Sequence, residues 1–268
     1  MSYKLIAVDM DGTLLNSQKE ISKETIKIIQ KLPDEGIIFT LCTGRPIQGV
    51  ADYAGQLGLT GPVITYNGAV IVKADSREVL FQQNLLREDA RKILEMGQRH
   101  QTTQCIWAGG RLYSNELNHR IHEYKKLSGV EPLLAEDFEA LLDLGVTKVI
   151  WDDEPEKVQR MLGNLQENDF SEVTYCTSTP EFLELFSSRV SKAIAMEKLG
   201  ALYHIKREEM VAMGDGLNDL SMIEYAGLGI AMGNAEPAIK AAAGYITDTN
   251  DADGVKKAIE MILSGAPY

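Results

Sequence analysis

The chain of 268 residues is long enough for one large domain or two ordinary ones, and we favour two. Its 39 Asp and Glu against 27 Lys and Arg give a net charge of -12, which argues against nucleic acid and anionic membranes as partners. Three cysteines without CxxC spacing, no apolar run of about 18 residues and no signal-peptide pattern at the start predict a soluble cytoplasmic protein.

Short apolar runs alternate with amphipathic stretches in the first third of the chain, which is typical of strands joined by crossover helices. The runs are apolar on both faces, as expected for a parallel sheet covered by helices on both sides. The expected strands are residues 5–8, 37–42 and 62–67, and the expected helices are residues 22–31 and 48–57.

The last third resumes this alternation, so both ends of the chain are expected to build one sheet. Strands are predicted at 210–213 and 228–232, with a further strand at YITD and a terminal helix after it. Helices are predicted at 191–203 and 218–226. The fold class expected for this part is α/β, with a Rossmann-like core of parallel strands.

The middle of the chain, residues 84–188, has a different pattern and is expected to be an inserted α+β domain with an antiparallel sheet. Polar stretches at 82–84 and 187–189 are the expected crossings, which leaves 1–83 and 189–268 as the core. The expected elements are helices at 88–100 and 156–168, a hairpin in QCIWAGGRLYS, a strand at 147–151, and strands at 172–176 and 182–186 around a turn at 178–180.

Asp9 and Asp11 follow the first apolar strand in LIAVDMDGT. Residues two apart on a strand face the same side, and at the carboxyl end of a parallel strand they point into the crevice where α/β sheets bind ligands. An isolated DxDG is more often a surface turn. The buried strand in front favours a site instead, because a carboxylate that leaves a buried strand requires a compensating cation.

The stretch LCTGRP, residues 41–46, ends the second strand with a hydroxyl, a glycine and a proline at an expected first helical turn. Free backbone N–H groups, the Thr43 hydroxyl and the helix N-terminus together could hold phosphate oxygens. An ordinary strand-to-helix turn capped by Thr43 explains the residues equally well.

Two further signals lie in the last third. Lys192 stands at the start of a predicted helix, where the helix dipole disfavours a cation by about 0.3–1 kcal/mol. A lysine at this position indicates some other role, although a surface lysine is the commoner explanation.

In VAMGDGLNDLSM a strand ends in Asp215 between two glycines, and Asn218 and Asp219 follow at a helix start. Carboxylates at two strand ends with small neighbours are the oxygen ligands that Mg²⁺ prefers.

Taken together, DMDGT, Thr43, Lys192 and GDGLND resemble in order and composition the four motifs of the haloacid dehalogenase superfamily of phosphatases. The fuller set LIAVDMDGTLLNS, CTGRP, ITYNGA and MGDGLNDLSMIEYAGLGIAMGNA resembles its Cof-type subfamily, which includes sugar-phosphate phosphatases. One residue departs from the pattern, because Ala193 follows Lys192 where the family usually has glycine.

The resemblance implies a Rossmann-like core with an α/β cap that closes over the substrate and sets specificity. By motif, Asp9 is the nucleophile that forms an aspartyl-phosphate, and Asp11 is the general acid and then the base. The implied Mg²⁺ site comprises Asp9, Asp11 through its backbone carbonyl, Asp215, and Asp219 as a ligand or as support for one. The implied phosphate-binding residues are Thr43, Gly44, Lys192 and Asn218.

The two aspartates are expected to differ in protonation. Asp9 has to be ionised to attack, so metal and lysine should lower its pKa, whereas Asp11 has to carry a proton for the leaving group, so its pKa should be raised when substrate is bound.

Arg45 and Asn67 are candidate substrate contacts from the core, although a surface ion pair and a turn are their ordinary explanations. The inserted domain offers Trp107, Arg111, Tyr113 and His122. The expected activity is Mg²⁺-dependent hydrolysis of small phosphomonoesters such as sugar phosphates, and the expected partner is a small phosphorylated metabolite. A phosphomutase and a non-catalytic phospho-metabolite binding protein are the alternatives, and the sequence leaves monomer or dimer open.

Overall fold

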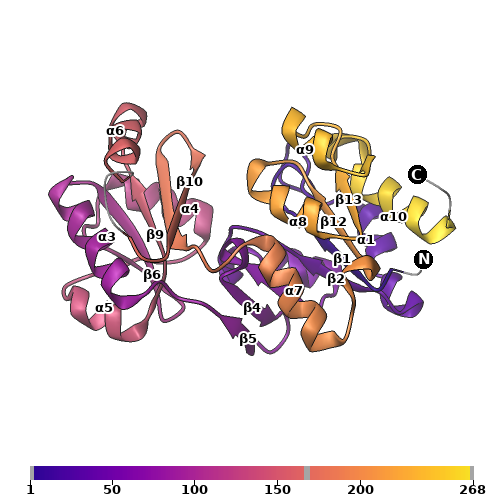
Figure 1. The fold of residues 1–268 in the computed structure, drawn as a ribbon, viewed down its shortest axis with the longest axis horizontal. Helices are drawn as coiled ribbons and strands as arrows, with labels where there is room; N and C mark the ends of the chain where they lie inside the picture. Colours follow the sequence, from indigo (N-terminus) through magenta and orange to yellow (C-terminus); the bar gives the residue numbers. More distant parts are fainter. Residues whose placement is uncertain (1–2, 166–169, 266–268) are drawn as a thin grey trace. The chain divides into compact units, whose positions relative to one another are not determined.

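The computed structural model describes residues 3–165 and 170–265, and the chain divides into two compact units. Met1–Gln82 and Val190–Tyr268 form the core unit, and Gln83–Arg189 form the inserted unit (Figure 1). The inserted unit therefore begins and ends one residue outside the expected boundaries, 84 and 188.

A parallel sheet of five strands lies at the centre of the core unit, in the order β14-β13-β12-β1-β2. Every residue of β1, β12 and β13 is buried, which confirms a parallel sheet covered on both faces. The strands are β1 (Leu5–Val8), β2 (Ile38–Leu41), β12 (Met210–Gly214), β13 (Leu228–Ala231) and β14 (Tyr245–Ile246).

Helices connect and follow these strands in the core unit, and α1 and α10 pack against one another (Figure 1). The α-helices are α1 (Lys23–Ile29), α2 (Ala51–Leu57), α7 (Lys192–Tyr203), α8 (Leu220–Tyr225), α9 (Pro237–Ala242) and α10 (Gly254–Ser264). The 3₁₀ helices are η1 (Leu32–Glu35), η2 (Ile47–Gly49), η3 (Tyr66–Gly68), η4 (Arg207–Glu209), η5 (Leu217–Asp219) and η6 (Asn250–Ala252).

The third apolar run, expected at 62–67 in the parallel sheet, is the main correction to the predicted core. Its strand β3 (Pro62–Thr65) belongs to an antiparallel sheet with β4 (Val70–Lys73) and β5 (Val79–Gln82), and a single parallel bridge, Cys42 to Ile64, joins it to the chain after β2. The backbone turns through positive φ at Tyr66, Asn67 and Gly68, which reverses the chain direction.

The inserted unit is built on a six-stranded sheet in the order β10-β11-β9-β6-β7-β8, antiparallel except for the pair β7 and β8. This confirms the antiparallel sheet expected for the insert. The strands are β6 (Thr103–Ala108), β7 (Arg111–Ser114), β8 (Leu133–Leu134), β9 (Val146–Asp152), β10 (Val173–Thr179) and β11 (Phe182–Ser187).

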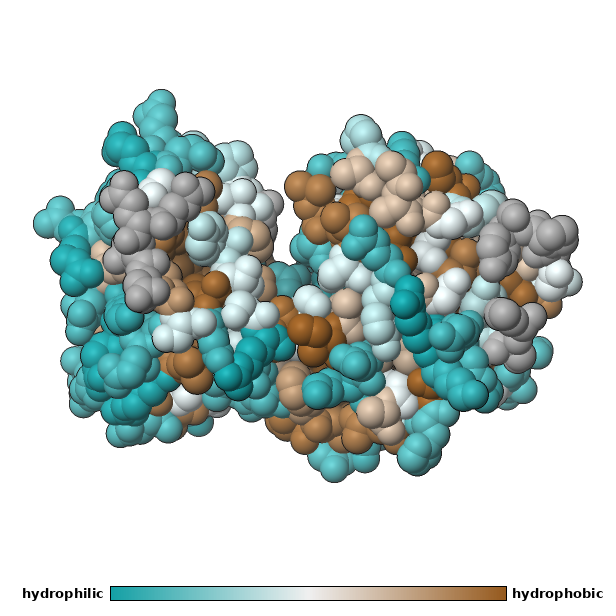
Figure 2. Space-filling view, in the orientation of Figure 1, coloured by the Kyte–Doolittle hydropathy of each residue, from teal (hydrophilic) through white to brown (hydrophobic). Residues whose placement is uncertain are grey.

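Four helices accompany this sheet, namely α3 (Arg87–Arg99), α4 (His119–Ser128), α5 (Phe138–Leu144) and α6 (Pro155–Leu165). Alternate strand residues such as Ile106, Val149 and Leu185 pack with Ile93 of α3 and Val158 of α6 in one apolar core. The outer surface over α3 and α5 is hydrophilic (Figure 2), and it carries the ion pairs of Arg87 and Arg91 with Glu139.

Several boundaries differ from the predicted ones. The turn expected at 178–180 is shorter, because β10 continues to Thr179 with an irregular register there. Pro46 does not open a helical turn but lies before η2 in an extended conformation, and α2 starts only at Ala51. The end of the helix expected at 156–168 lies partly outside the described residues. No long apolar helix that could cross a membrane occurs in the described ranges.

Candidate active site

The register of the parallel sheet brings separate stretches of chain to one edge. Val8, the last residue of β1, pairs with Met213 of β12 on one side and with Leu41 of β2 on the other. The residues that follow these strands, among them Asp9 and Thr43, therefore leave the sheet at the same carboxyl edge. Ligands of open α/β sheets bind at that edge.

Asp9, Asp215 and Asp219 form an acidic cluster there. One carboxylate oxygen from each lies within 4.8 Å of the corresponding oxygens of the other two. The Lys192 ammonium lies between two of them, with Nζ 2.5 Å from Asp9 Oδ1 and 2.6 Å from Asp219 Oδ1. Lys192 is 1% exposed, so it is a buried cation and not a surface lysine.

The start of α7 explains how a lysine occupies a position that the helix dipole disfavours. Ser191 is the N-cap, and its Oγ accepts a hydrogen bond from the Ile194 N–H at 3.1 Å. The dipole costs a cation about 0.3–1 kcal/mol, whereas Lys192 here gains two carboxylate partners. Ala193 leaves this start intact, because the helix still begins at Lys192.

Asp219 is held by hydrogen bonds within its own loop. Its Oδ2 accepts from the N–H groups of Asp215 at 2.9 Å and Gly216 at 3.0 Å, while its Oδ1 faces Lys192. Both oxygens therefore have protein donors already. This arrangement suits a residue that orients the lysine and the Asp215 loop, which is the supporting role of the two implied for it.

The residues after Asp11 pack against Asp215. The Thr13 hydroxyl donates a hydrogen bond to Asp215 Oδ1 at 2.7 Å. Gly12 has φ +82°, and a Cβ there would lie 2.3 Å from Asp215 Oδ2. A larger residue at position 12 would therefore displace that carboxylate.

The protein groups of the cluster raise the pKa of Asp9 and of Asp215. Burial raises the pKa of Asp9 to about 8, and repulsion from Asp219 adds to the rise while Lys192 opposes it. Burial likewise raises the pKa of Asp215 to about 6. The expected lowering depends on the metal together with Lys192, and the lysine alone does not balance three carboxylates taken out of water.

The side chains around Asp11 lower its pKa, whereas the expected rise belongs to the substrate-bound state. Partial burial pushes its pKa upward, but hydrogen bonds from Arg45 and Lys19 bring the pKa below its usual value. Arg45 is bidentate, with Nε 2.7 Å from Oδ2 and Nη2 2.6 Å from Oδ1, and Lys19 Nζ lies 2.9 Å from Oδ1. The Asp11 carboxylate is thus not part of the acidic cluster of Asp9, Asp215 and Asp219. Arg45 makes an ion pair, the ordinary alternative named for it, with a site residue as its partner.

The expected phosphate-binding loop is ordered around Thr43. The Thr43 hydroxyl accepts a hydrogen bond from the Arg45 N–H at 3.1 Å, and its carbonyl accepts from the Asn67 N–H at 3.0 Å. Gly44 lies against the Asn67 carboxamide, which a Cβ at position 44 would approach to 3.0 Å. Asn218 donates to Asn67 Oδ1 at 3.4 Å, so Asn67 brings Thr43, Gly44 and Asn218 together.

Some residues that contact the site were not identified from the sequence. Asn234 Nδ2 donates to the Gly12 carbonyl at 2.7 Å, and Asn250 Nδ2 donates to the Leu15 carbonyl at 2.9 Å. Asn250 N–H donates in turn to Asn234 Oδ1 at 3.0 Å. A single asparagine in a loop does not indicate a site residue by its type. Asn234 does lie in MGNA, at the end of the quoted motif MGDGLNDLSMIEYAGLGIAMGNA.

The candidate contacts of the inserted unit differ in exposure. Trp107 is 1% exposed and donates to the Tyr124 hydroxyl at 3.0 Å, so it is a core residue and not a ligand contact. Tyr113 also packs against the apolar core, whereas Arg111 and His122 are exposed.

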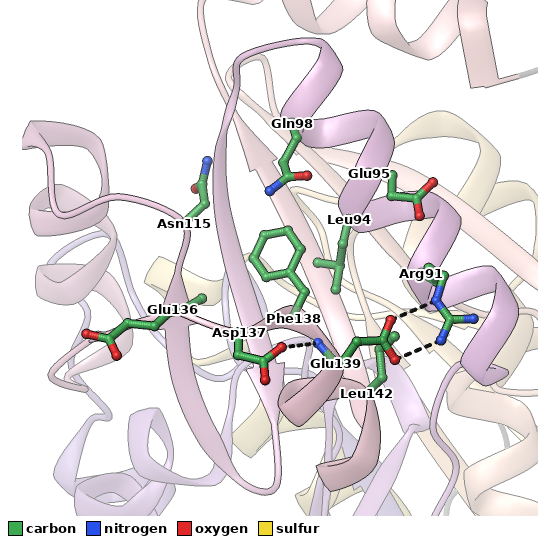
Figure 3. Close-up of a pocket in the computed structure, with 11 residues that line it drawn as sticks. Arg91, Leu94, Glu95, Gln98, Asn115, Glu136, Asp137, Phe138, Glu139 and Leu142 are labelled. Atoms are coloured by element: carbon green, nitrogen blue, oxygen red, sulfur yellow. Dashed lines mark hydrogen bonds and ion pairs between the residues drawn. The ribbon is translucent and has the colours of Figure 1, made fainter.

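The inserted unit also has a cavity of about 350 Å³ between α3 and the start of α5 (Figure 3). Phe138, Leu94 and the ion pair of Arg91 with Glu139 line it. None of the expected site residues lies in its wall.

The acidic cluster has the chemistry of a divalent-cation site. Three carboxylates and one ammonium leave an excess of negative charge at a buried position, and carboxylate oxygens are hard ligands. Burial and, to a lesser degree, repulsion from Asp219 raise the pKa values of Asp9 and Asp215, and a cation among these oxygens would oppose both effects.

The core is an open parallel α/β sheet with a centre of carboxylates at its carboxyl edge. A family model described as haloacid dehalogenase-like hydrolase matches residues 6–259. The chain therefore belongs to the haloacid dehalogenase-like hydrolase family, which confirms the resemblance, including its Cof-type subfamily.

Individual relatives agree with this assignment. The chain is 35% identical to 5-amino-6-(5-phospho-D-ribitylamino)uracil phosphatase YcsE of Bacillus subtilis, over 97% of this chain and 95% of that protein. A haloacid dehalogenase-like hydrolase from Bacteroides thetaiotaomicron has a similar structure, with a TM-score of 0.86 and 34% identity over 97% and 100% of the two chains. A subclass IIB sugar phosphatase matches with a TM-score of 0.81 and 25% identity over 98% and 99%. The chain is a phosphatase, a phosphoric monoester hydrolase.

Proposed function

We propose that this chain is a Mg²⁺-dependent phosphatase that hydrolyses small phosphomonoesters such as sugar phosphates through an aspartyl-phosphate on Asp9. The observation that carries the proposal is the buried group of Asp9, Asp215, Asp219 and Lys192 at the carboxyl edge of the sheet. A relative described as a sugar phosphatase supports the substrate class.

Asp9 and Asp215 are the proposed side-chain ligands of Mg²⁺, with the backbone carbonyl of Asp11 as a third ligand. Asp219 supports them, because its two oxygens already accept hydrogen bonds from Lys192 and from the N–H groups of Asp215 and Gly216. Mg²⁺ supplies positive charge that keeps Asp9 ionised and offsets its repulsion of the phosphate dianion, which is about 4 kcal/mol per pair of charges at 4 Å.

In the first step an Asp9 oxygen attacks the phosphorus atom, and the bond from phosphorus to the leaving oxygen breaks. Asp11 gives its proton to that oxygen, so the product leaves as an alcohol. Lys192 and the loop of Thr43, Gly44 and Asn218 hold the phosphoryl oxygens, because phosphoryl transfer depends mainly on positioning and charge stabilisation.

In the second step water attacks the phosphorus atom of the aspartyl-phosphate. Asp11, now ionised, takes a proton from this water, and the bond between the Asp9 oxygen and phosphorus breaks. Inorganic phosphate is released and Asp9 is again a carboxylate. Asp11 therefore acts as the general acid in the first step and as the general base in the second.

Selection among leaving groups is proposed for Arg45 and Asn67 of the core and for the inserted unit, with Arg111 and His122 as its exposed candidates. The core residues account for phosphate and metal but offer few groups to a sugar. The specificity of such enzymes is measured as a ratio of kcat/KM values.

The proposal is tested by release of inorganic phosphate from a panel of hexose phosphates and the ribitylaminouracil phosphate in the name of YcsE, with and without Mg²⁺. Acid quenching with labelled substrate should trap label on the wild-type protein and none on Asp9→Asn. The exposed Asp34→Asn is the matched control and should behave as wild type. Full turnover by Asp9→Asn would refute the covalent mechanism, and an isomerised product without phosphate would indicate a mutase.

A further inference from the structure

The Asp11 carboxylate is held by two cations from different parts of the core unit. Arg45 binds both of its oxygens at 2.6 and 2.7 Å, and Lys19 binds Oδ1 at 2.9 Å. The Asp11 side chain is 41% exposed, so these two contacts are the ion pairs that hold it among the described residues. Its orientation therefore depends on how firmly the two cations are themselves placed.

Tyr53 of α2 contacts both cations. Its hydroxyl donates a hydrogen bond to the Lys19 carbonyl at 3.1 Å. Its ring lies under the Arg45 guanidinium, with Cζ 5.5 Å from the ring centroid, within the range of a cation–π interaction. One aromatic side chain thus supports the two groups that hold Asp11.

Lys19 has a backbone conformation that requires such support. Its φ is +61°, in the left-handed region that a lysine rarely adopts. Asn16 closes the turn around it, because Asn16 Oδ1 accepts from the N–H groups of Gln18 at 3.0 Å and Glu20 at 2.9 Å. The turn and the Tyr53 hydroxyl together direct the Lys19 side chain toward Asp11.

We propose that Tyr53 is a positioning residue for the acid–base group Asp11 and acts through Lys19 and Arg45. The inference rests on the proposed function, in which Asp11 transfers the proton. An Asp11 side chain without these supports occupies several rotamers, and only some of them reach the leaving oxygen. Proton transfer, and hence kcat, then depends on the supports, whereas phosphate binding by the Thr43 loop does not.

The test compares Tyr53→Phe and Lys19→Met in a phosphatase assay on the full chain, with p-nitrophenyl phosphate and glucose 6-phosphate as probes. Each variant should lower kcat about 3- to 10-fold and change KM less than about 2-fold, as expected for lost orientation. Lys19→Arg should restore most of kcat. Lys23→Met, an exposed lysine of the neighbouring α1, is the matched control and should leave both constants unchanged.

The decisive measurement repeats both substitutions in an Asp11→Asn background. If Tyr53 and Lys19 act through Asp11, neither should change the residual kcat there. The same loss in both backgrounds would overturn the inference, and so would a rise in KM at unchanged kcat. Lys19 has a side chain 60% exposed, so Lys19→Met is not expected to impair folding.

Failure of this inference is separate from failure of the proposed function. Full activity of Asp11→Asn would remove the proposed acid–base role of Asp11 and this inference with it, whereas the aspartyl-phosphate on Asp9 is tested separately by Asp9→Asn. A strongly impaired Asp11→Asn together with wild-type kcat in Tyr53→Phe and Lys19→Met would overturn only the role of Tyr53.

Discussion

Lys192 Nζ lies 2.5 Å from Asp9 Oδ1 in a buried ion pair, although 183 positions separate the two residues in the chain. Asp219 binds the same ammonium from the other side at 2.6 Å. The lysine thus connects Asp9, which follows β1, with the loop that carries Asp215 and Asp219. Burial removes water as an alternative partner for all three groups.

Replacement of Lys192 by Met should reduce both activity and stability. Two buried carboxylates lose their cation, and breaking a buried pair from one side costs about 3–5 kcal/mol in the free energy of unfolding. Urea unfolding at neutral pH measures this loss, and phosphate release is expected to fall at least about 100-fold. Lys198→Met, an exposed lysine of the same helix, is the control. Wild-type stability of Lys192→Met would contradict a net role of the pair in folding.

Mg²⁺ should stabilise the folded protein, and chelation should abolish activity. A ligand at a hundredfold excess over its Kd adds about 2.7 kcal/mol to the free energy of unfolding. Thermal unfolding with increasing Mg²⁺ should therefore show a rise in Tm that is strongly reduced in Asp215→Asn and retained in Asp34→Asn. An equal rise in the two variants would mean that Mg²⁺ binds elsewhere.

Asn234→Ala should slow turnover without preventing folding. The Asn234 amide holds the carbonyl of Gly12, directly after Asp11, and a hydrogen bond of this kind contributes about 1 kcal/mol. If the loss falls on the reactive geometry, kcat should decrease about 5-fold at nearly constant KM. Steady-state kinetics measure the effect. Gln56→Ala replaces an exposed amide of α2 and should not change kcat. An unchanged kcat in Asn234→Ala would show that the loop keeps its geometry without this hydrogen bond.

The native protein should react very slowly with thiol reagents at pH 8. Burial raises the pKa of Cys42 to about 12 and that of Cys176 to about 11, and it raises the pKa of Cys105 well above its usual value. For a pKa of about 11 only about one thiol in a thousand is ionised at pH 8, and the thiolate is the reactive form. A colorimetric titration should therefore count three thiols quickly in urea and none quickly in the native state. A fast native reaction would show that one thiol is accessible and ionised.

The motifs of the sequence predicted most of the site because they are local. Asp9, Asp215 and Thr43 each follow an apolar strand, and parallel strands bring their carboxyl ends to one edge whatever the length of chain between them. The inserted unit could be predicted for a similar reason, since the alternation of strands and crossover helices stops and later resumes. Element boundaries were less accurate, as at Pro46, because extended and helical conformations compete there.

The third strand could not be placed from its composition. An apolar run has the same appearance in a parallel and in an antiparallel sheet, and its pairing was decided by three consecutive positive φ angles from Tyr66 to Gly68. Lys19, Tyr53, Asn234 and Asn250 were missed because each is an ordinary surface residue type. Only their partners distinguish them.

The sequence by itself determined the fold class, the family and the residues at the strand ends, since these depend on local pattern and spacing. Only the tertiary structure decided which groups surround the two aspartates. Asp9 lies buried among other carboxylates, which raises its pKa, while Asp11 lies beside Arg45 and Lys19, which lower its pKa. A pKa is set by burial and by charges a few ångströms away, and those distances exist only once the chain has folded.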